Sequence, residues 1–193
     1  MKKINEIFYS LQGEGRNTGR AAVFIRFSGC NLKCPFCDTQ HQSGTLMTDE
    51  MIIEQAKKYP TDLVVLTGGE PSLFVDEAFL NKLHDAGFYV AMETNGTHPI
   101  PFGVNFVTVS PKFEFCEGAD VVVKECDELK VVFTGNNDFS KYEDINAHYR
   151  YIQPCDTGSE EDNRRIVEAS IQFVLQHPVW RLSLQTQKIT NIR

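Results

Sequence analysis

The chain has 193 residues, 41% hydrophobic and 23% charged, and its formal net charge at pH 7 is -7; this fits one globular domain, residues 1–193, that buries a core without disulfide staples. The acidic balance argues against binding to nucleic acid, which requires a basic surface, and no apolar run is long enough for a signal peptide or a membrane span. We therefore expect a cytoplasmic protein that acts on a small molecule and binds neither nucleic acid nor membrane.

Short runs of β-branched and aromatic residues predict largely buried strands. In chain order they are residues 23–27, 63–67, 88–93, 104–109, 129–133 and 149–153, with 180–184 as a further candidate. Helices are predicted between or after them at residues 48–59, 75–86 and 159–176. Thr48 is a good N-cap, and Gly87 is a stop signal after the second helix.

Strands that alternate with helices predict parallel βαβ units. We therefore expect an α/β fold, an incomplete TIM-like barrel of parallel strands with about six strands and three main helices. In such a barrel the active site lies on the loops at the C-terminal ends of the strands. The loop after the first predicted strand is accordingly the first place to look for chemistry.

That loop contains three thiols, Cys30, Cys34 and Cys37, in a C-x3-C-x2-C pattern. Thiolates hold iron–sulfur cubanes, and three protein ligands leave one iron open to bind a cofactor or substrate. Zinc is the alternative, because His41 offers a fourth ligand for a closed Cys3His site in a non-catalytic binding module. The remaining cysteines have irregular spacing and are predicted to be core or loop thiols: Cys116, Cys126 and Cys155.

The triplet, with Phe36 before its last cysteine, resembles the cluster motif of the radical S-adenosylmethionine superfamily. The sequence TGGEP at residues 67–71 resembles the GGEP motif of the same superfamily. The resemblance implies a [4Fe–4S] cluster on the three cysteines, S-adenosylmethionine chelated at the open iron, and a reductant such as a flavodoxin. A glycyl-radical-enzyme activase is one enzymatic alternative, since small activases carry the same triplet.

Longer stretches resemble the 7-carboxy-7-deazaguanine synthase family over nearly the whole chain. They are FYSLQGEG at 8–15, FIRFSGC at 24–30, CDT at 37–39, ETNG at 93–96, SPK at 110–112, YIQP at 151–154 and RLSLQTQK at 181–188. The resemblance implies ring contraction of 6-carboxy-5,6,7,8-tetrahydropterin to 7-carboxy-7-deazaguanine with release of ammonia, on the route to queuosine and other deazapurines. It also implies catalytic use of S-adenosylmethionine, a requirement for Mg²⁺, and a homodimer.

The same resemblance implies roles for individual residues, with Thr39 as the magnesium ligand. Residues matched to S-adenosylmethionine are Phe36, Asp38, Gly69, Glu70, Gly96, Ser110, Lys112, Gln153, Pro154, Cys155 and Asp156. Residues matched to the substrate are Leu11, Gln12, Gly13, Glu14, Arg26, Thr94 and Arg193, the last through its terminal carboxylate.

Side-chain chemistry supports two of these substrate roles. Arg26 offers a planar, permanently charged fork that suits a carboxylate. Glu14 offers an acceptor for the amino-pyrimidinone edge of a pterin. The alternatives are a surface ion pair for Arg26 and a loop without a site for Glu14.

Overall fold

The computed structural model describes residues 1–37 and 39–192. In this part of the chain nine strands form one sheet in the order β3-β1-β2-β4-β5-β6-β7-β8-β9. The strands are β1 (Lys2–Leu11), β2 (Ala21–Phe27), β3 (Thr45–Met47), β4 (Leu63–Gly68), β5 (Tyr89–Thr94), β6 (Phe106–Val109), β7 (Glu125–Phe133), β8 (Asn146–Pro154) and β9 (Trp180–Leu182). The α-helices are α1 (Asp49–Ala56), α2 (Glu77–Asp85), α3 (Glu160–Gln176) and α4 (Thr186–Thr190).

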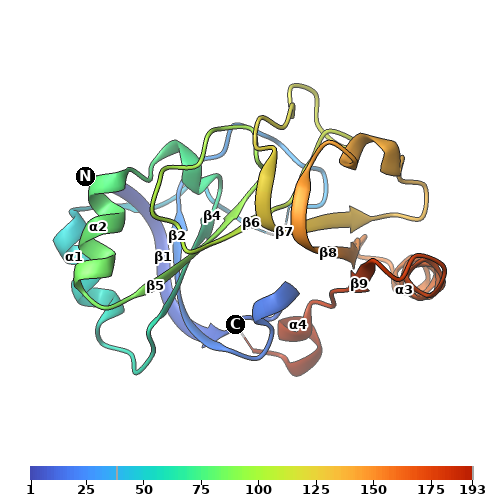
Figure 1. Ribbon diagram of the computed structural model, residues 1–193. Coiled ribbons are helices and arrows are strands. Elements are labelled where there is room, and N and C mark those ends of the chain that lie inside the picture. Colours follow the sequence, from blue (N-terminus) through green and yellow to red (C-terminus); the bar gives the residue numbers. More distant parts are fainter. Residues whose placement is uncertain (38, 193) are drawn as a thin grey trace.

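Every neighbouring pair from β2 through β9 is parallel, whereas β1 pairs antiparallel with both β2 and β3. The sheet curls around an open interior, with α1 and α2 outside one end and α3 outside the other (Figure 1). The fold is the α/β, incomplete TIM-like barrel expected from the sequence. In the described residues, no helix is both long and apolar enough to cross a membrane.

The predicted strands and the three main helices are all present, with boundaries shifted by a few residues. Thr48 caps α1 as expected, since its side chain accepts a hydrogen bond from the Met51 amide, and Ser159 caps α3 in the same way. The second helix begins later than predicted, because Asp76 is its N-cap and accepts from the amide of Phe79. The helix ends at Asp85, and Gly87, whose φ is +89°, follows two residues later, in agreement with the stop signal.

The sequence analysis predicted neither β1 nor β3, and it missed the short helix α4. Strand β1 mixes charged and apolar residues, so it lacks the continuous apolar run of a buried parallel strand. It is stabilised instead by antiparallel pairing with β2, including the stacked rings of Phe8 and Phe24. The barrel therefore carries two additional strands at its N-terminal edge.

Two apolar clusters fill the space between the sheet and its helices. One joins β2, β4 and β5 to α1 and α2, and it includes the fully buried Phe79, Leu80 and Leu83. The other joins β7, β8 and β9 to α3, where Phe139 stacks on Phe173 with ring centroids 4.3 Å apart. Because these two clusters lie between the sheet and its helices, the interior of the barrel at the C-terminal ends of the strands is left for a site.

We predict that Phe79→Ala lowers the free energy of unfolding by about 3–5 kcal/mol, because it empties a fully buried aromatic position. Urea unfolding followed by circular dichroism measures this loss. The control is Leu175→Ala on α3, where the side chain is 72% exposed and the change should stay within about 0.5 kcal/mol. Equal losses in the two variants would contradict this account of the core.

Candidate active site

A cavity of about 890 Å³ opens at the C-terminal ends of the parallel strands. That volume lies within the range of small-molecule and cofactor sites. Predicted site residues that line it are Leu11, Gln12, Gly13, Glu14, Arg26, Cys30, Cys34, Phe36, Cys37, Thr39, Gly69, Glu70, Thr94, Ser110, Lys112, Gln153, Pro154, Cys155 and Asp156. Gly96 does not line the cavity, and Asp38 and Arg193 lie outside the described residues.

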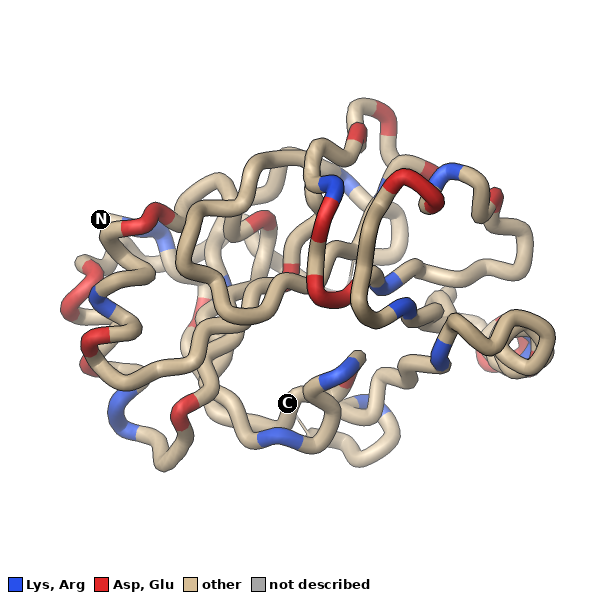
Figure 2. Tube along the Cα trace, viewed as in Figure 1, with Lys and Arg blue, Asp and Glu red and all other residues tan. Residues whose placement is uncertain are grey.

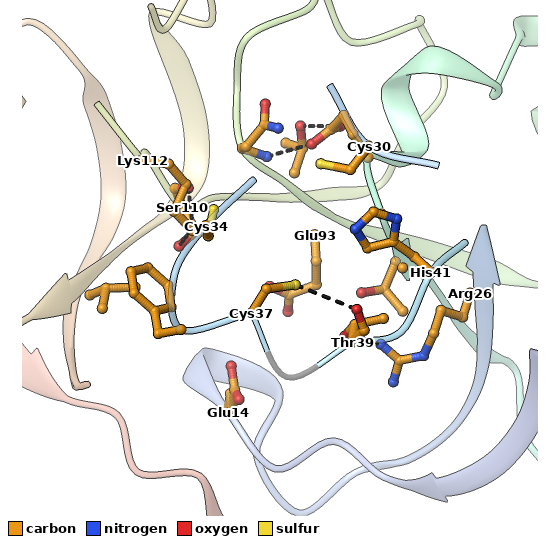
Figure 3. A pocket seen from close by; sticks show the side chains of 18 of the residues that line it. Glu14, Arg26, Cys30, Cys34, Cys37, Thr39, His41, Glu93, Ser110 and Lys112 are labelled. Carbon is orange, nitrogen blue, oxygen red and sulfur yellow. Dashed lines mark hydrogen bonds between the residues drawn. The ribbon is translucent and has the colours of Figure 1, made fainter. Parts of the chain in front are cut away.

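The three thiols of the triplet share the cavity wall after β2 (Figure 3). Within residues 1–37 and 39–192, no three His, Cys, Asp or Glu side chains converge closely enough to hold one metal ion. A single zinc ion needs every ligand atom within about 2.3 Å of the metal, whereas a [4Fe–4S] cubane offers a separate iron atom to each thiolate. The triplet on one cavity wall provides the three thiolates that a [4Fe–4S] cluster takes as protein ligands.

The GGEP turn is locked to the strand end that precedes Cys30. The amide of Gly69 donates to the Phe27 carbonyl at 3.0 Å, and the amide of Glu70 donates to the Gly29 carbonyl at 2.9 Å. A Cβ atom on Gly69 would lie 1.8 Å from the Gly29 oxygen, so no larger residue fits this approach. The two motifs are thus held side by side by main-chain contacts.

The Glu70 carboxylate is buried and connects this turn to the end of β5. Its Oε1 atom accepts from the Thr94 hydroxyl at 2.6 Å and from the Ser72 amide at 3.0 Å, and its Oε2 atom accepts from the Asn95 amide at 2.7 Å. The Thr94 hydroxyl also accepts from the Gly96 amide at 3.1 Å. Gly96 therefore contacts the cavity-lining Thr94 without lining the cavity itself.

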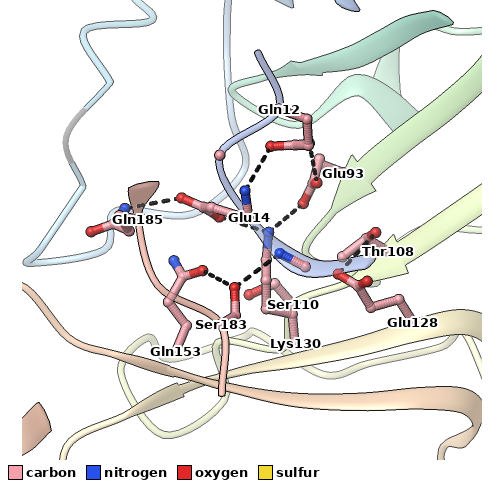
Figure 4. Close-up of polar contacts among 12 residues, drawn as sticks. Gln12, Glu14, Glu93, Thr108, Ser110, Glu128, Lys130, Gln153, Ser183 and Gln185 are labelled. Carbon is pink, nitrogen blue, oxygen red and sulfur yellow. Dashed lines mark hydrogen bonds and ion pairs between the residues drawn. The ribbon is translucent and has the colours of Figure 1, made fainter. Parts of the chain in front are cut away.

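A second group of polar residues surrounds the buried ammonium of Lys130 (Figure 4). Its Nζ atom lies 2.7 Å from Glu14 and 2.8 Å from Glu93. The side-chain amides of Gln185 and Gln187 each donate to the other oxygen of Glu14 at 3.0 Å. We call these five residues the Lys130 network.

The pKa values of two carboxyl groups near Lys130, those of Glu14 and Glu128, are shifted in opposite directions. Burial opposes ionisation of Glu14, but Lys130 and the hydrogen bonds from the two glutamines overcome it and lower its pKa to about 2. Burial raises the pKa of Glu128 to about 7, with Lys130 opposing that shift. Glu14 is consequently ionised at neutral pH, whereas Glu128 changes its protonation state near neutral pH.

Arg26 lies on β2 and belongs to the cavity wall rather than to the outer surface. Its Nε atom donates to Glu6 at 2.8 Å, and its Nη1 atom donates to the Thr39 hydroxyl at 2.9 Å. The guanidinium also lies 5.6 Å from the centre of the Phe8 ring. The ion pair anticipated as an alternative exists, yet it orients a side chain that remains part of the cavity.

The opposite wall follows β6 and β8. Lys112 donates to the Ser110 carbonyl at 2.5 Å and to its hydroxyl at 2.7 Å, and burial lowers the pKa of this lysine. Asp156 is held by Lys188 at 2.5 Å and by Asn163 at 2.8 Å, and these bonds lower its pKa. This wall therefore presents hydroxyl, amide and charged groups to the cavity.

Comparison with known proteins agrees with this site. A model of the Radical SAM superfamily matches residues 24–110. A 7-carboxy-7-deazaguanine synthase of Bacteroides thetaiotaomicron is 53% identical over the full length of both chains, and one of Burkholderia multivorans is 39% identical over 98% of each. The chain belongs to the 7-carboxy-7-deazaguanine synthase family. A crystal structure of QueE from Escherichia coli has 26% identity and a TM-score of 0.72, covering 95% of this chain and 93% of that one.

Family membership makes the chain a radical S-adenosylmethionine enzyme and implies a [4Fe–4S] cluster together with that cofactor. Sequence reasoning nevertheless missed much of the Lys130 network, namely Glu93, Lys130, Gln185 and Gln187. One signal was available: Glu128 and Lys130 lie two residues apart in an apolar strand, so they share a face. Figure 2 shows both charge signs along β7.

We predict that Glu14→Gln flattens the acid side of the stability curve of this family member. A carboxyl whose pKa is about 2 when folded, against 4.5 as its ordinary value, adds stability above pH 4.5 that is lost as the pH falls toward 2. The difference of about 2.5 units corresponds to about 3 kcal/mol. Urea unfolding at a series of pH values from 7 to 3 should therefore show a shallower decline in the variant.

The control is Glu54→Gln, because the Glu54 side chain is 75% exposed and only touches Lys57 at 4.0 Å. Its stability curve should follow wild type. If the Glu14→Gln curve runs parallel to wild type throughout the acid range, the ion pair with Lys130 does not stabilise the folded chain.

Proposed function

We propose that residues 1–193 form one catalytic domain that converts 6-carboxy-5,6,7,8-tetrahydropterin into 7-carboxy-7-deazaguanine with release of ammonia. The main observation in support of this proposal is that the cysteine triplet, the GGEP turn, Arg26 and Glu14 all line one cavity. Relatives named for this synthase activity match the whole chain, which supports the same reaction here. The proposal extends to a cytoplasmic homodimer reduced by a donor such as a flavodoxin.

Cys30, Cys34 and Cys37 are the proposed ligands of the [4Fe–4S] cluster, and their number leaves one iron without a protein ligand. When bound and reduced, the cluster supplies the electron that cleaves S-adenosylmethionine to a 5′-deoxyadenosyl radical. The main-chain carbonyls of the GGEP turn, which contains Gly69, and the Glu70 carboxylate are the proposed contacts of the cofactor's ammonium. The other proposed contacts are Phe36, Asp38, Ser110, Lys112, Gln153, Pro154, Cys155 and Asp156, with Gly96 acting through Thr94.

The pterin is proposed to lie between Arg26 and Glu14, beside Leu11, Gln12, Gly13 and Thr94 and near the terminal carboxylate of Arg193. Because its pKa is lowered to about 2, Glu14 is anionic at neutral pH and accepts hydrogen bonds from the amino-pyrimidinone edge. Glu6 fixes the orientation of the Arg26 guanidinium before substrate binds. A preoriented charge loses less conformational entropy when it contacts a carboxylate.

Mg²⁺ is proposed to bind the Thr39 hydroxyl as its protein ligand. Magnesium prefers oxygen and commonly keeps several of its waters, so one hydroxyl beside a carboxylated substrate is a reasonable ligand set. The Thr39 oxygen accepts from Arg26 at 2.9 Å. A hydroxyl oxygen has two lone pairs, so this bond is compatible with metal ligation.

The decisive experiment is an anaerobic assay of the reconstituted chain with the carboxylated pterin, S-adenosylmethionine, Mg²⁺ and a reductant. We expect 7-carboxy-7-deazaguanine and ammonia, with many product molecules formed per 5′-deoxyadenosine released, and no product from Cys37→Ala. Mass spectrometry measures both small molecules. Release of one 5′-deoxyadenosine per product would show that the cofactor is consumed. Absence of the product from enzyme with a full cluster would contradict the proposed reaction.

The role of Thr39 is tested separately. Omitting Mg²⁺ should lower the rate in wild type but have less effect in Thr39→Ala.

We further predict that Arg26→Lys keeps the charge but lowers kcat/KM for the carboxylated pterin by about ten- to a hundred-fold. Loss of a charge-assisted, fork-shaped hydrogen bond costs about 1.5–3 kcal/mol. The cluster content, measured from the visible spectrum, should equal that of wild type. The discriminating measurement compares this substrate with a pterin that lacks the carboxylate, because the variant should distinguish the two less well.

Arg20→Lys is the matched control, since Arg20 is exposed and bonds Asn17 at 3.0 Å outside the cavity. Its kinetics should match wild type. Should Arg26→Lys retain the full preference for the carboxylated pterin, another residue reads that group.

A further inference from the structure

A fourth thiol lies directly behind the cysteine triplet. The Sγ atom of Cys116 donates a hydrogen bond to the Sγ atom of Cys34 across 3.5 Å. Cys34 lines the cavity, whereas Cys116 is not among the residues that line it. The two cysteines are 82 residues apart in the chain, so the contact depends entirely on the fold.

We propose that Cys116 donates its S–H hydrogen bond to the cluster ligand Cys34 and thereby raises the reduction potential of the [4Fe–4S] cluster. This inference rests on the proposed function, because it requires Cys34 to ligate iron. Cys116 is then neither a ligand nor a catalytic residue. It acts on the cluster only through the sulfur of Cys34.

The segment that carries Cys116 is fixed against the cluster loop at a second point. The amides of Phe115 and Cys116 both donate to the Lys112 carbonyl at 2.9 Å, which forms a tight turn after β6. The Phe115 ring meets the edge of Phe36 with centroids 4.8 Å apart and planes at 88°. Ring contact and sulfur contact together hold the Cys116 thiol in place beside Cys34.

The three ligand sulfurs have different hydrogen-bonding partners. Cys30 accepts from the Leu32 amide at 3.4 Å, and Cys37 lies 3.6 Å from the Thr39 carbonyl. Cys34 has the thiol of Cys116 as its partner. A ligating thiolate accepts hydrogen bonds and donates none, so among these contacts the S–H of Cys116 is a side-chain donor directed at a ligand sulfur.

The direction of the effect follows from charge. Reduction adds an electron to the cluster, and part of that charge resides on the thiolate sulfurs. A donor at one of these sulfurs stabilises the reduced state more than the oxidised state, which raises the potential. The reductant then transfers its electron more readily, and the reduced cluster has a smaller driving force for cleaving S-adenosylmethionine.

The test is a redox titration of the reconstituted full chain, followed by EPR of the reduced cluster. Cys116→Ala should assemble the cluster with a more negative potential, because the donor is removed. Cys116→Ser keeps an O–H donor and should lie closer to wild type. Cys126→Ala is the matched control, since that buried thiol bonds the Asn146 carbonyl at 3.8 Å, away from the cavity. The cluster of this variant should have the wild-type reduction potential.

A second measurement detects the proton itself. Pulsed EPR in H₂O and D₂O should reveal an exchangeable proton coupled to the reduced wild-type cluster that is absent in Cys116→Ala. An unchanged potential in Cys116→Ala at full cluster content would overturn the proposal. Loss of the cluster in both Cys116 variants would also overturn it, since Cys116 would then be a ligand or a structural residue. Failure of wild type to assemble a cluster would instead contradict the proposed function.

Discussion

Parallel pairing of the strands from β2 to β9 is the constraint on which the site depends. It places the C-terminal ends of these strands on one rim, so the loops that follow them open into the same cavity. The rim is reinforced by bonds from the first residues after a strand to the neighbouring strand end. Examples are Gly69 to Phe27, Ser110 to Thr94 at 2.8 Å and Cys155 to Phe133 at 2.9 Å. Motifs dispersed along the sequence thereby become one site.

The open side of the barrel poses a different problem, because β1 and β9 are not hydrogen-bonded to each other. The loop after β1 and the segment after β9 bridge this side: the Gly15 amide donates to Ser183 at 2.9 Å, and Thr186 donates to the Gly13 carbonyl. A Cβ atom on Gly13 would lie 2.9 Å from the backbone nitrogen of Gln187, so a larger residue would require the main chain of this bridge to shift. The Lys130 network lies beneath this bridge, where its ion pairs are shielded from water and each charge needs its partner.

The sequence predicted the parallel strands and the three main helices, and nearly all of its predicted site residues in the described part of the chain line the cavity, because apolar runs, caps and short motifs are local signals. Strand β1 escaped prediction because its stability comes from antiparallel pairing rather than from its own apolar content. Glu93 and Lys130 escaped as site residues because each acquires its role only when β5 and β7, which flank β6 in the sheet, bring their side chains together. Cys116 was predicted to be a core or loop thiol, and its position beside Cys34 depends on packing that spacing alone does not encode.

The finished cavity has two chemically different sides, sulfur with main-chain carbonyls on one and fixed charges on the other. Arg26 lies in the wall of this cavity, where it bonds Thr39 in the cysteine loop and Glu6 on β1. The position of the guanidinium thus depends on the cysteine loop as well as on β1. Radical chemistry demands that the site generating the radical and the site holding the substrate keep a fixed separation. Because Arg26 is bonded to both the cysteine loop and β1, it provides a fixed link between these two segments within the cavity wall.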